Sequence, residues 1–130
     1  MESEFEKGKL ILIDKPYKWT SFDAVNSLRN DLKRKAKLPK IKIGHAGTLD
    51  PLATGLMIIC TGKWTKKIHI FQDLDKEYIG QITLGATTPS FDLETEIDQE
   101  YPIEHITEQM IYDAAKSFIG TIEQFPPIYS

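Results

Sequence analysis

Two continuous apolar runs in the first half of the chain predict strands. Residues 10–13 read Leu-Ile-Leu-Ile, and the Asp-Lys-Pro triplet at 14–16 has the composition of a turn. We expect a buried strand over 8–13 that leads into this turn. A second apolar run, over 56–61, also has strand length, and we expect it to be buried on both faces.

The segment between these runs has a helical pattern. Apolar side chains recur every three or four residues over 21–35. Thr20 is a suitable N-cap, and Asp23 follows at the spacing of a capping box. We therefore predict a helix from about Ser21 to Lys35, closed by Pro39. A second, shorter helix is expected over 62–71.

The second half of the chain alternates between strand and helix patterns. Residues 78–84 alternate like a half-buried strand, and 85–105 form a polar, acidic connection. Thr107 caps a predicted helix that ends at Gly120, and 121–125 return to strand character. Strands and helices mix without a regular βαβ order, which predicts an α+β fold.

Composition limits the class of protein. The chain has 130 residues and is 41% hydrophobic, enough for one compact domain with a core. Its polar, acidic start does not resemble a signal peptide, and no apolar stretch has the length needed to cross a bilayer. The single cysteine, Cys60, excludes an internal disulfide and is expected to pack in the core. We expect a soluble, cytoplasmic protein.

Charge is distributed unevenly along the chain. Residues 1–67 carry 14 Lys and Arg against 7 Asp and Glu, whereas residues 68–130 carry 2 against 12. Seven cations fall within 29–42, where Asp31 is the one acid. Such a cluster suits a polyanion, since phosphate neutralisation dominates nucleic-acid affinity. Cations also favour the negative end of a helix, so the charge pattern alone leaves both interpretations open.

The glycine-rich run over 43–55, Ile-Gly-His-Ala-Gly-Thr-Leu-Asp-Pro-Leu-Ala-Thr-Gly, is the most informative segment. Its Asp-Pro pair is also the chemistry of a simple turn. However, Gly44 and Gly47 allow the backbone to approach a bound group closely, and the basic cluster lies immediately upstream. A lone carboxylate can act as a covalent nucleophile. Asp50 is therefore the candidate catalytic residue.

Other chemistry-bearing residues give weaker signals. His45, His69 and His105 are far apart and have no Cys or carboxylate at ligand spacing, so no metal site is predicted. Tyr78 starts a predicted strand, where a tyrosine serves either packing or function. Its pattern alone does not decide between the two.

Residues 44–55 resemble the catalytic motif of the TruB family, the tRNA pseudouridine-55 synthases. Further segments that occur in that family's order are Ile13–Pro16, Thr20-Ser21, Thr61–Lys63, Lys76–Tyr78, Leu84-Gly85 and Pro127–Ser130. The resemblance covers nearly all of the chain. It implies a pseudouridine synthase-like fold, with a mixed or antiparallel central sheet and flanking helices.

The resemblance also implies a reaction. A uridine in the T-loop of tRNA is isomerised to pseudouridine at position 55, after its base is flipped out of the stack. Asp50 would be the nucleophile, attacking either C1′ of the sugar or C6 of the base. Tyr78 would stack on the target base, His45 would contact the flipped-out nucleotide, and Lys15 would brace the site. The resemblance implies no cofactor or metal, and it implies the tRNA T-stem-loop as the partner. The basic segment 29–42 would supply the phosphate contacts.

Family members continue well past the residues matched by Tyr129 and Ser130. The segment beyond carries an arginine that pairs with the nucleophile, completes the sheet, and is often followed by an RNA-binding domain. We therefore expect residues 1–130 to be a truncated, N-terminal portion of the catalytic domain, inactive alone and monomeric when full length. Thr95 stands where the family usually has glycine, which would alter a loop. The alternative is a non-catalytic RNA-binding module that uses the basic 29–42 face.

Overall fold

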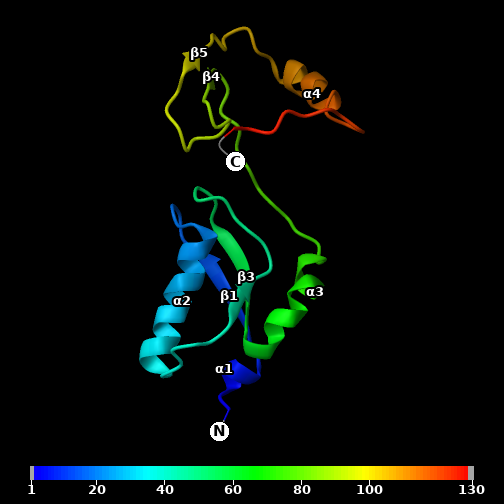
Figure 1. Ribbon diagram of the computed structural model, residues 1–130. Helices are drawn as coiled ribbons and strands as arrows, with labels where there is room; N and C mark the ends of the chain where they lie inside the picture. Colours follow the sequence, from blue (N-terminus) through cyan, green and yellow to red (C-terminus); the bar gives the residue numbers. More distant parts are fainter. Residues whose placement is uncertain (1, 129–130) are drawn as a thin grey trace. The chain divides into compact units, whose positions relative to one another are not determined.

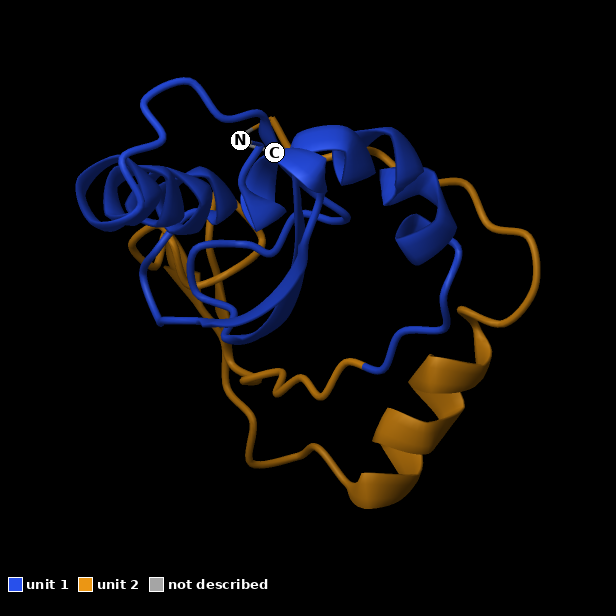
Figure 2. Cartoon of the chain, turned by 90° about the horizontal axis from the view of Figure 1, so that it is seen from below, with its two compact units in different colours: residues 1–77 blue, residues 78–130 orange. Residues whose placement is uncertain are grey.

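The computed structural model describes residues 2–128. It divides into two compact units, residues 1–77 and 78–130 (Figure 2). The final family-like segment therefore falls partly outside the description, since Tyr129 and Ser130 lie beyond the described residues. The α+β class is confirmed, and both sheets of the described chain are antiparallel.

The first unit is built on a three-stranded sheet in the order β1-β3-β2 (Figure 1). β1 spans Leu10–Lys15, β2 spans Ile43–His45, and β3 spans Gly55–Thr61. Both predicted strands are confirmed, but β1 begins and ends two residues later than expected, so Asp14 and Lys15 belong to the strand and not to the predicted turn. β2 escaped prediction because three residues with a central glycine are too short to show a strand pattern.

Helix α2, Ser21–Lys35, has the predicted bounds. The hydroxyl of Thr20 accepts the Asp23 amide at 3.0 Å, and the Asp23 carboxylate accepts the Thr20 amide at 2.8 Å. These bonds complete the predicted capping box. The hydrogen bond from the Thr20 backbone is the main cause that lowers the pKa of the Asp23 carboxyl below 3.8.

The core of the first unit lies between α2 and the sheet. Ala24 and Val25 of α2 are buried, as are Met57 and Ile59 of the central strand. Directly paired residues of antiparallel strands share a face, so His45 lies on the same face as its partner Ile59. This core fixes α2 over the sheet.

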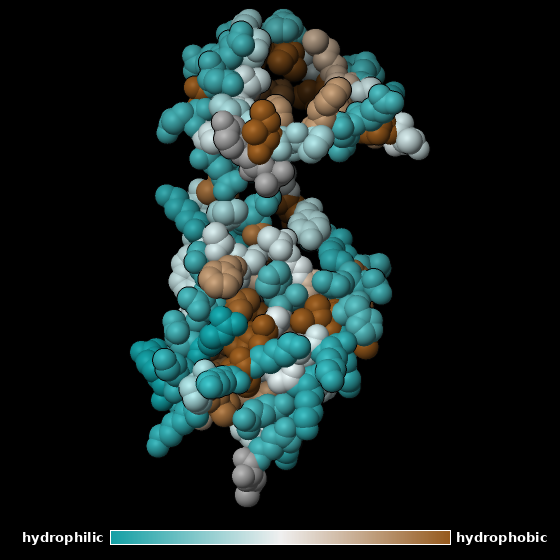
Figure 3. Space-filling view, in the orientation of Figure 1, coloured by the Kyte–Doolittle hydropathy of each residue, from teal (hydrophilic) through white to brown (hydrophobic). Residues whose placement is uncertain are grey.

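The opposite face of the sheet is only partly covered. A 3-10 helix, η1, spans Gly62–Lys67 and continues into α3, Ile68–Gln72, so the helix predicted over 62–71 is confirmed as two segments. Apolar side chains remain exposed over the strands between α2 and α3 (Figure 3). Leu12 and Leu56 are 60% and 63% exposed, so the prediction of complete burial for these two strands is wrong.

The N-terminal helix α1, Glu4–Lys7, packs against the end of β3. The hydroxyl of Thr61 donates to the Phe5 carbonyl at 2.8 Å and accepts the Lys9 amide at 3.1 Å. Gly62 follows with φ +56°, and a Cβ there would stand 2.1 Å from the Glu6 carbonyl oxygen. Only glycine allows both this conformation and this contact.

The second unit contains a small hairpin and one helix. β4, Ala86–Thr87, pairs with β5, Gln99–Glu100, within the segment predicted as a connection. α4 spans Glu108–Lys116, and its predicted cap, Thr107, accepts the Met110 amide at 3.3 Å. The helix ends earlier than predicted, because residues 117–120 form turns.

Two predicted strands, 78–84 and 121–125, are absent from the second unit. A strand needs a hydrogen-bonded neighbour, and neither segment has one among residues 2–128. Ile79 and Ile82 are accordingly 94% and 90% exposed. Their alternating pattern indicates the capacity to form a strand, but no partner strand realises it here.

We predict that Gly62→Ala lowers the free energy of unfolding by about 1–3 kcal/mol, because it combines a left-handed φ with a clash against α1. Gly47→Ala is the matched control, since a Cβ at Gly47 meets no heavy atom within 4 Å. Urea unfolding followed by tryptophan fluorescence measures both variants. Equal stability of the two variants would show that neither the left-handed conformation of Gly62 nor its close contact with α1 requires glycine.

Candidate functional site

The site is a loop, residues 46–54, that joins β2 to β3. At its start the Ala46 amide donates to the Ile58 carbonyl at 2.9 Å, which extends the ladder beyond β2. At its centre the Ala53 amide donates to the Asp50 carbonyl at 3.0 Å. This bond closes a β-turn over residues 50–53. The Asp-Pro pair therefore does form a turn, as its sequence allows. This turn uses the Asp50 backbone and gives its side chain no role.

Lys15 connects this turn to the end of β1. Its side chain has 0% exposure, and Nζ donates to the carbonyls of Pro16 at 3.0 Å, Trp19 at 2.6 Å and Pro51 at 3.2 Å. An ammonium has three N–H donors, and each meets one carbonyl oxygen. Among the described residues Lys15 forms no ion pair with a carboxylate. The buried charge is stabilised by peptide dipoles, and the bracing role expected for Lys15 agrees with these contacts.

Two further contacts hold the loop from the same side. The Lys18 amide donates to the Pro51 carbonyl at 2.8 Å. The hydroxyl of Ser21 accepts the Leu49 amide at 2.8 Å and donates to the Leu49 carbonyl at 3.1 Å. The backbone on both sides of Asp50 is therefore tied to the segment 15–21. The sequence places Ser21 at the start of a predicted helix and in a family-like segment, but it does not predict this contact.

The Asp50 side chain is exposed at the tip of this fixed backbone. Within the described part of the chain its carboxylate has no hydrogen bond and no ion pair, although its main-chain carbonyl is engaged in the turn. A rigid backbone thus presents an unengaged, accessible carboxylate. Such a group is free to bond to a ligand.

His45 is the last residue of β2 and directly precedes the loop that carries Asp50. The imidazole is half-buried, and its Nδ1 atom is buried with no hydrogen-bond partner among the described residues. Buried polar atoms are normally hydrogen-bonded. The Nδ1 atom of His45 is an exception among the described residues, and the rest of the imidazole remains partly exposed beside the loop.

Tyr78 is the first residue of the second unit, and its side chain is 71% exposed. Asp50 and His45 belong to the other unit, so the structure does not bring Tyr78 together with them. Its exposure shows that the ring is not used for packing within the second unit. The neighbouring Ile79 and Ile82 are exposed as well, so the choice between packing and function for Tyr78 stays open.

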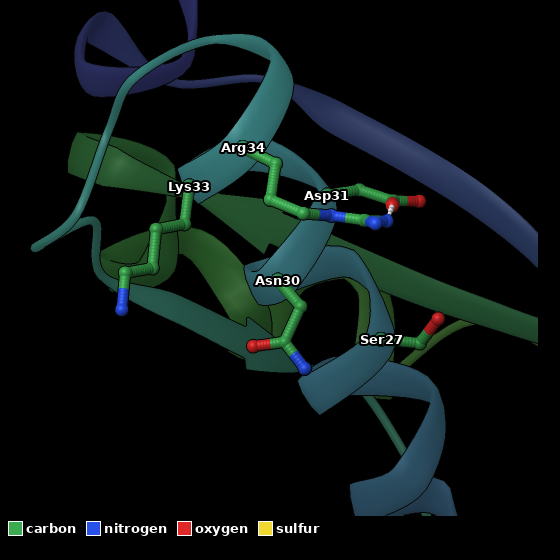
Figure 4. Close-up of a pocket in the computed structure, with 5 residues that line it drawn as sticks. All are labelled: Ser27, Asn30, Asp31, Lys33 and Arg34. Atoms are coloured by element: carbon green, nitrogen blue, oxygen red, sulfur yellow. Dashed lines mark hydrogen bonds and ion pairs between the residues drawn. The ribbon is translucent and has the colours of Figure 1, made fainter.

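The basic segment 29–42 lies away from the loop. α2 has 15 residues and is therefore about 22 Å long (Figure 1). Its N-terminal end holds Leu49, whereas four of the seven cations lie in its C-terminal half and the other three follow the helix. An open depression there is lined by five side chains of α2: Ser27, Asn30, Asp31, Lys33 and Arg34 (Figure 4). Arg34 turns toward Asp31 at 2.8 Å, whereas Lys33 points away (Figure 4). Proximity in sequence to Asp50 does not become proximity in space.

The loop that carries Thr95 forms a local hydrogen-bond network in the second unit. The Asp92 carboxylate accepts the Ser90 hydroxyl at 2.6 Å and the Glu94 amide at 2.9 Å. These bonds, chiefly that from Ser90, lower the pKa of the Asp92 carboxyl below 3.8. The Thr95 hydroxyl accepts the Ser90 amide at 3.3 Å. Threonine at position 95 thus supplies a side-chain contact within this loop that a glycine would lack.

Other groups in the described residues have structural roles or form no site. Cys60 is fully buried in β3, and burial raises the pKa of its thiol, in agreement with the predicted packing role. Across residues 2–128 no three or more His, Cys, Asp or Glu side chains gather to hold a metal ion. None of the helices described there has both the length and the apolar character needed to cross a bilayer.

Comparison with known proteins identifies the class. The family described as "TruB family pseudouridylate synthase (N terminal domain)" matches residues 33–130. The chain therefore belongs to the TruB family of pseudouridylate synthases.

Individual relatives extend the match to nearly the whole chain. The tRNA pseudouridine synthase B of Flavobacterium johnsoniae is 61% identical over 128 residues, which cover 98% of this chain and 56% of the relative. The protein of the same name from Phocaeicola vulgatus is 60% identical over 126 residues, covering 97% and 54%. That from Chlorobium luteolum is 50% identical over 125 residues, covering 96% and 43%. The chain spans about half the length of these curated relatives.

We predict that Lys15→Met lowers the free energy of unfolding by about 2–4 kcal/mol, since three carbonyl groups lose the ammonium that they share. Lys18→Met is the matched control, because it removes the same charge from an exposed side chain and keeps the Lys18 amide. Chemical denaturation compares the two variants. If both are equally stable, the three-carbonyl contact does not brace the loop.

Proposed function

We propose that this chain is the N-terminal portion of the catalytic domain of a longer polypeptide that converts uridine to pseudouridine in the T-loop of tRNA. The observation that carries the proposal is the exposed, unengaged carboxylate of Asp50 on a backbone held at both sides. Membership of the TruB family and the name shared by the relatives support the reaction and the substrate.

Asp50 acts as the nucleophile in this proposal. Its carboxylate bonds either to C1′ of the ribose or to C6 of the uracil, and the two routes have the same net outcome. The C1′–N1 bond breaks, the base rotates, and a C1′–C5 bond forms. The hydrogen at C5 leaves as a proton, N1 gains a proton, and the bond to Asp50 is cleaved. Atoms and electrons balance without an oxidant or a reductant, so the step does not itself require a redox cofactor.

His45 and Tyr78 serve the substrate rather than the bond changes. The target base must leave its stack before Asp50 can reach it. His45 contacts the flipped-out nucleotide region, and the partial exposure of its imidazole next to the loop supports such a use. Tyr78 stacks on the flipped base, and its exposed ring supports this role. That no metal takes part, that the full-length protein is monomeric and that it is cytoplasmic stay predictions.

The basic segment 29–42 supplies phosphate contacts at a distance from the chemistry. The four cations within α2 lie in its C-terminal half, away from the end that holds the loop. A folded tRNA presents backbone phosphates well beyond the target nucleotide, so both ends of α2 can serve one substrate. A non-catalytic RNA-binding module would need only this basic end.

We expect Asp50→Asn in the longer polypeptide to lower the rate of pseudouridine formation in a tRNA T-stem-loop by at least about 10⁴-fold. RNA affinity should stay unchanged, because the backbone contacts of the loop do not involve the carboxylate. Asp75→Asn, which alters another exposed aspartate of the first unit, is the control and should be fully active.

Two outcomes would contradict the proposal. Turnover that survives Asp50→Asn would exclude Asp50 as the nucleophile, and the RNA-binding alternative would gain support if the unaltered polypeptide binds RNA but never isomerises it. Residues 1–130 alone form a third sample in the same assay, and full activity from them would show that the chain is not a mere portion of the catalytic domain.

A further inference from the structure

We propose that Ser21 is a positioning residue, which aims the Asp50 carboxylate by fixing the two peptide groups on either side of Leu49. The proposal rests on the proposed function, in which Asp50 is the nucleophile. It adds to that function a residue 29 positions earlier in the chain, on a different element.

The contact is unusually complete for a single hydroxyl. Ser21 is 4% exposed, and its Oγ accepts the Leu49 amide at 2.8 Å while donating to the Leu49 carbonyl at 3.1 Å. The amide belongs to the peptide group that precedes the Leu49 Cα atom, and the carbonyl belongs to the peptide group that leads into Asp50. One side chain therefore orients both planes. The second of these planes contains the Asp50 Cα atom. Its orientation therefore affects the direction in which the Asp50 side chain points.

The other side of Asp50 is held independently. The Asp50 carbonyl accepts the Ala53 amide, and the Pro51 carbonyl accepts both Lys15 Nζ and the Lys18 amide. Loss of the Ser21 hydroxyl would release only the N-terminal side of the nucleophile and leave the turn closed. The expected result is a rotation of the carboxylate, with the fold retained.

The helix itself does not require this hydroxyl. Ser21 is the first residue of α2, where the capping bonds come from Thr20 and Asp23. The only hydrogen bonds of the Ser21 side chain among the described residues are the two with Leu49. A buried hydroxyl that is dispensable for its own helix and fully used on the catalytic loop has a positioning role. Because Thr20 is adjacent and caps the same helix, it provides a matched comparison.

The test uses the longer polypeptide and a tRNA T-stem-loop. Ser21→Ala is expected to lower kcat about 10- to 100-fold, the loss typical of a misplaced reacting group, while KM and the Kd for RNA stay unchanged. Thr20→Ala should lower Tm through loss of the cap and leave kcat unchanged. Ser21→Cys keeps a side chain of similar size but bonds weakly, so it should show the same loss of kcat even if Ser21→Ala does not fold.

The outcomes separate this inference from the proposed function. Wild-type kcat in Ser21→Ala or in a folded Ser21→Cys, together with an inactive Asp50→Asn, would overturn the role of Ser21 alone. Turnover by Asp50→Asn would overturn the proposed function as well. If Ser21→Ala and Thr20→Ala lose kcat in proportion to their loss of Tm, the hydroxyl is structural and the inference is wrong.

Discussion

The buried ammonium of Lys15 is the contact on which the geometry of the candidate site depends. A charge removed from water is costly unless all its donors are satisfied, and here three carbonyl oxygens meet three N–H groups. Two of those carbonyls, from Pro16 and Trp19, belong to the turn after β1, and the third, from Pro51, belongs to the candidate catalytic turn. The need to satisfy one charge therefore brings together segments separated by 32 or more residues. The ammonium makes the two turns a single structural unit.

Helix α2 completes this arrangement and gives its two ends different uses. Its N-terminal end is fixed by the Thr20 capping box and holds Leu49 through Ser21, while its C-terminal end carries the basic segment. The loop with Asp50 is thus supported by the termini of regular elements. Such support suits the role proposed for Asp50, because a nucleophile that is in place before the substrate arrives loses little freedom on binding. The sheet of the first unit leaves apolar surface uncovered, and so does the unpaired 78–84 segment of the second unit.

Local signals in the sequence predicted what local interactions determine. The bounds of α2 follow from apolar periodicity and from a capping box between neighbours, and Asp50 was marked by its glycine-rich context and by the family resemblance. Non-local features could not be predicted in the same way. The 78–84 pattern allows a strand, but a strand forms only beside another, and none is present among the described residues. The contact of Ser21 with Leu49 spans 28 residues and leaves no periodic trace, so only the folded chain reveals it.

Amide hydrogen exchange in the longer polypeptide, without RNA, tests most directly whether the loop is fixed in advance. The amides of Lys18, Leu49 and Ala53 each donate a hydrogen bond that holds the turn, and the account predicts protection comparable to that of the β3 amides. Exchange of these three amides at the rate of an unstructured peptide, with β3 still protected, would contradict a loop that is fixed before the substrate binds.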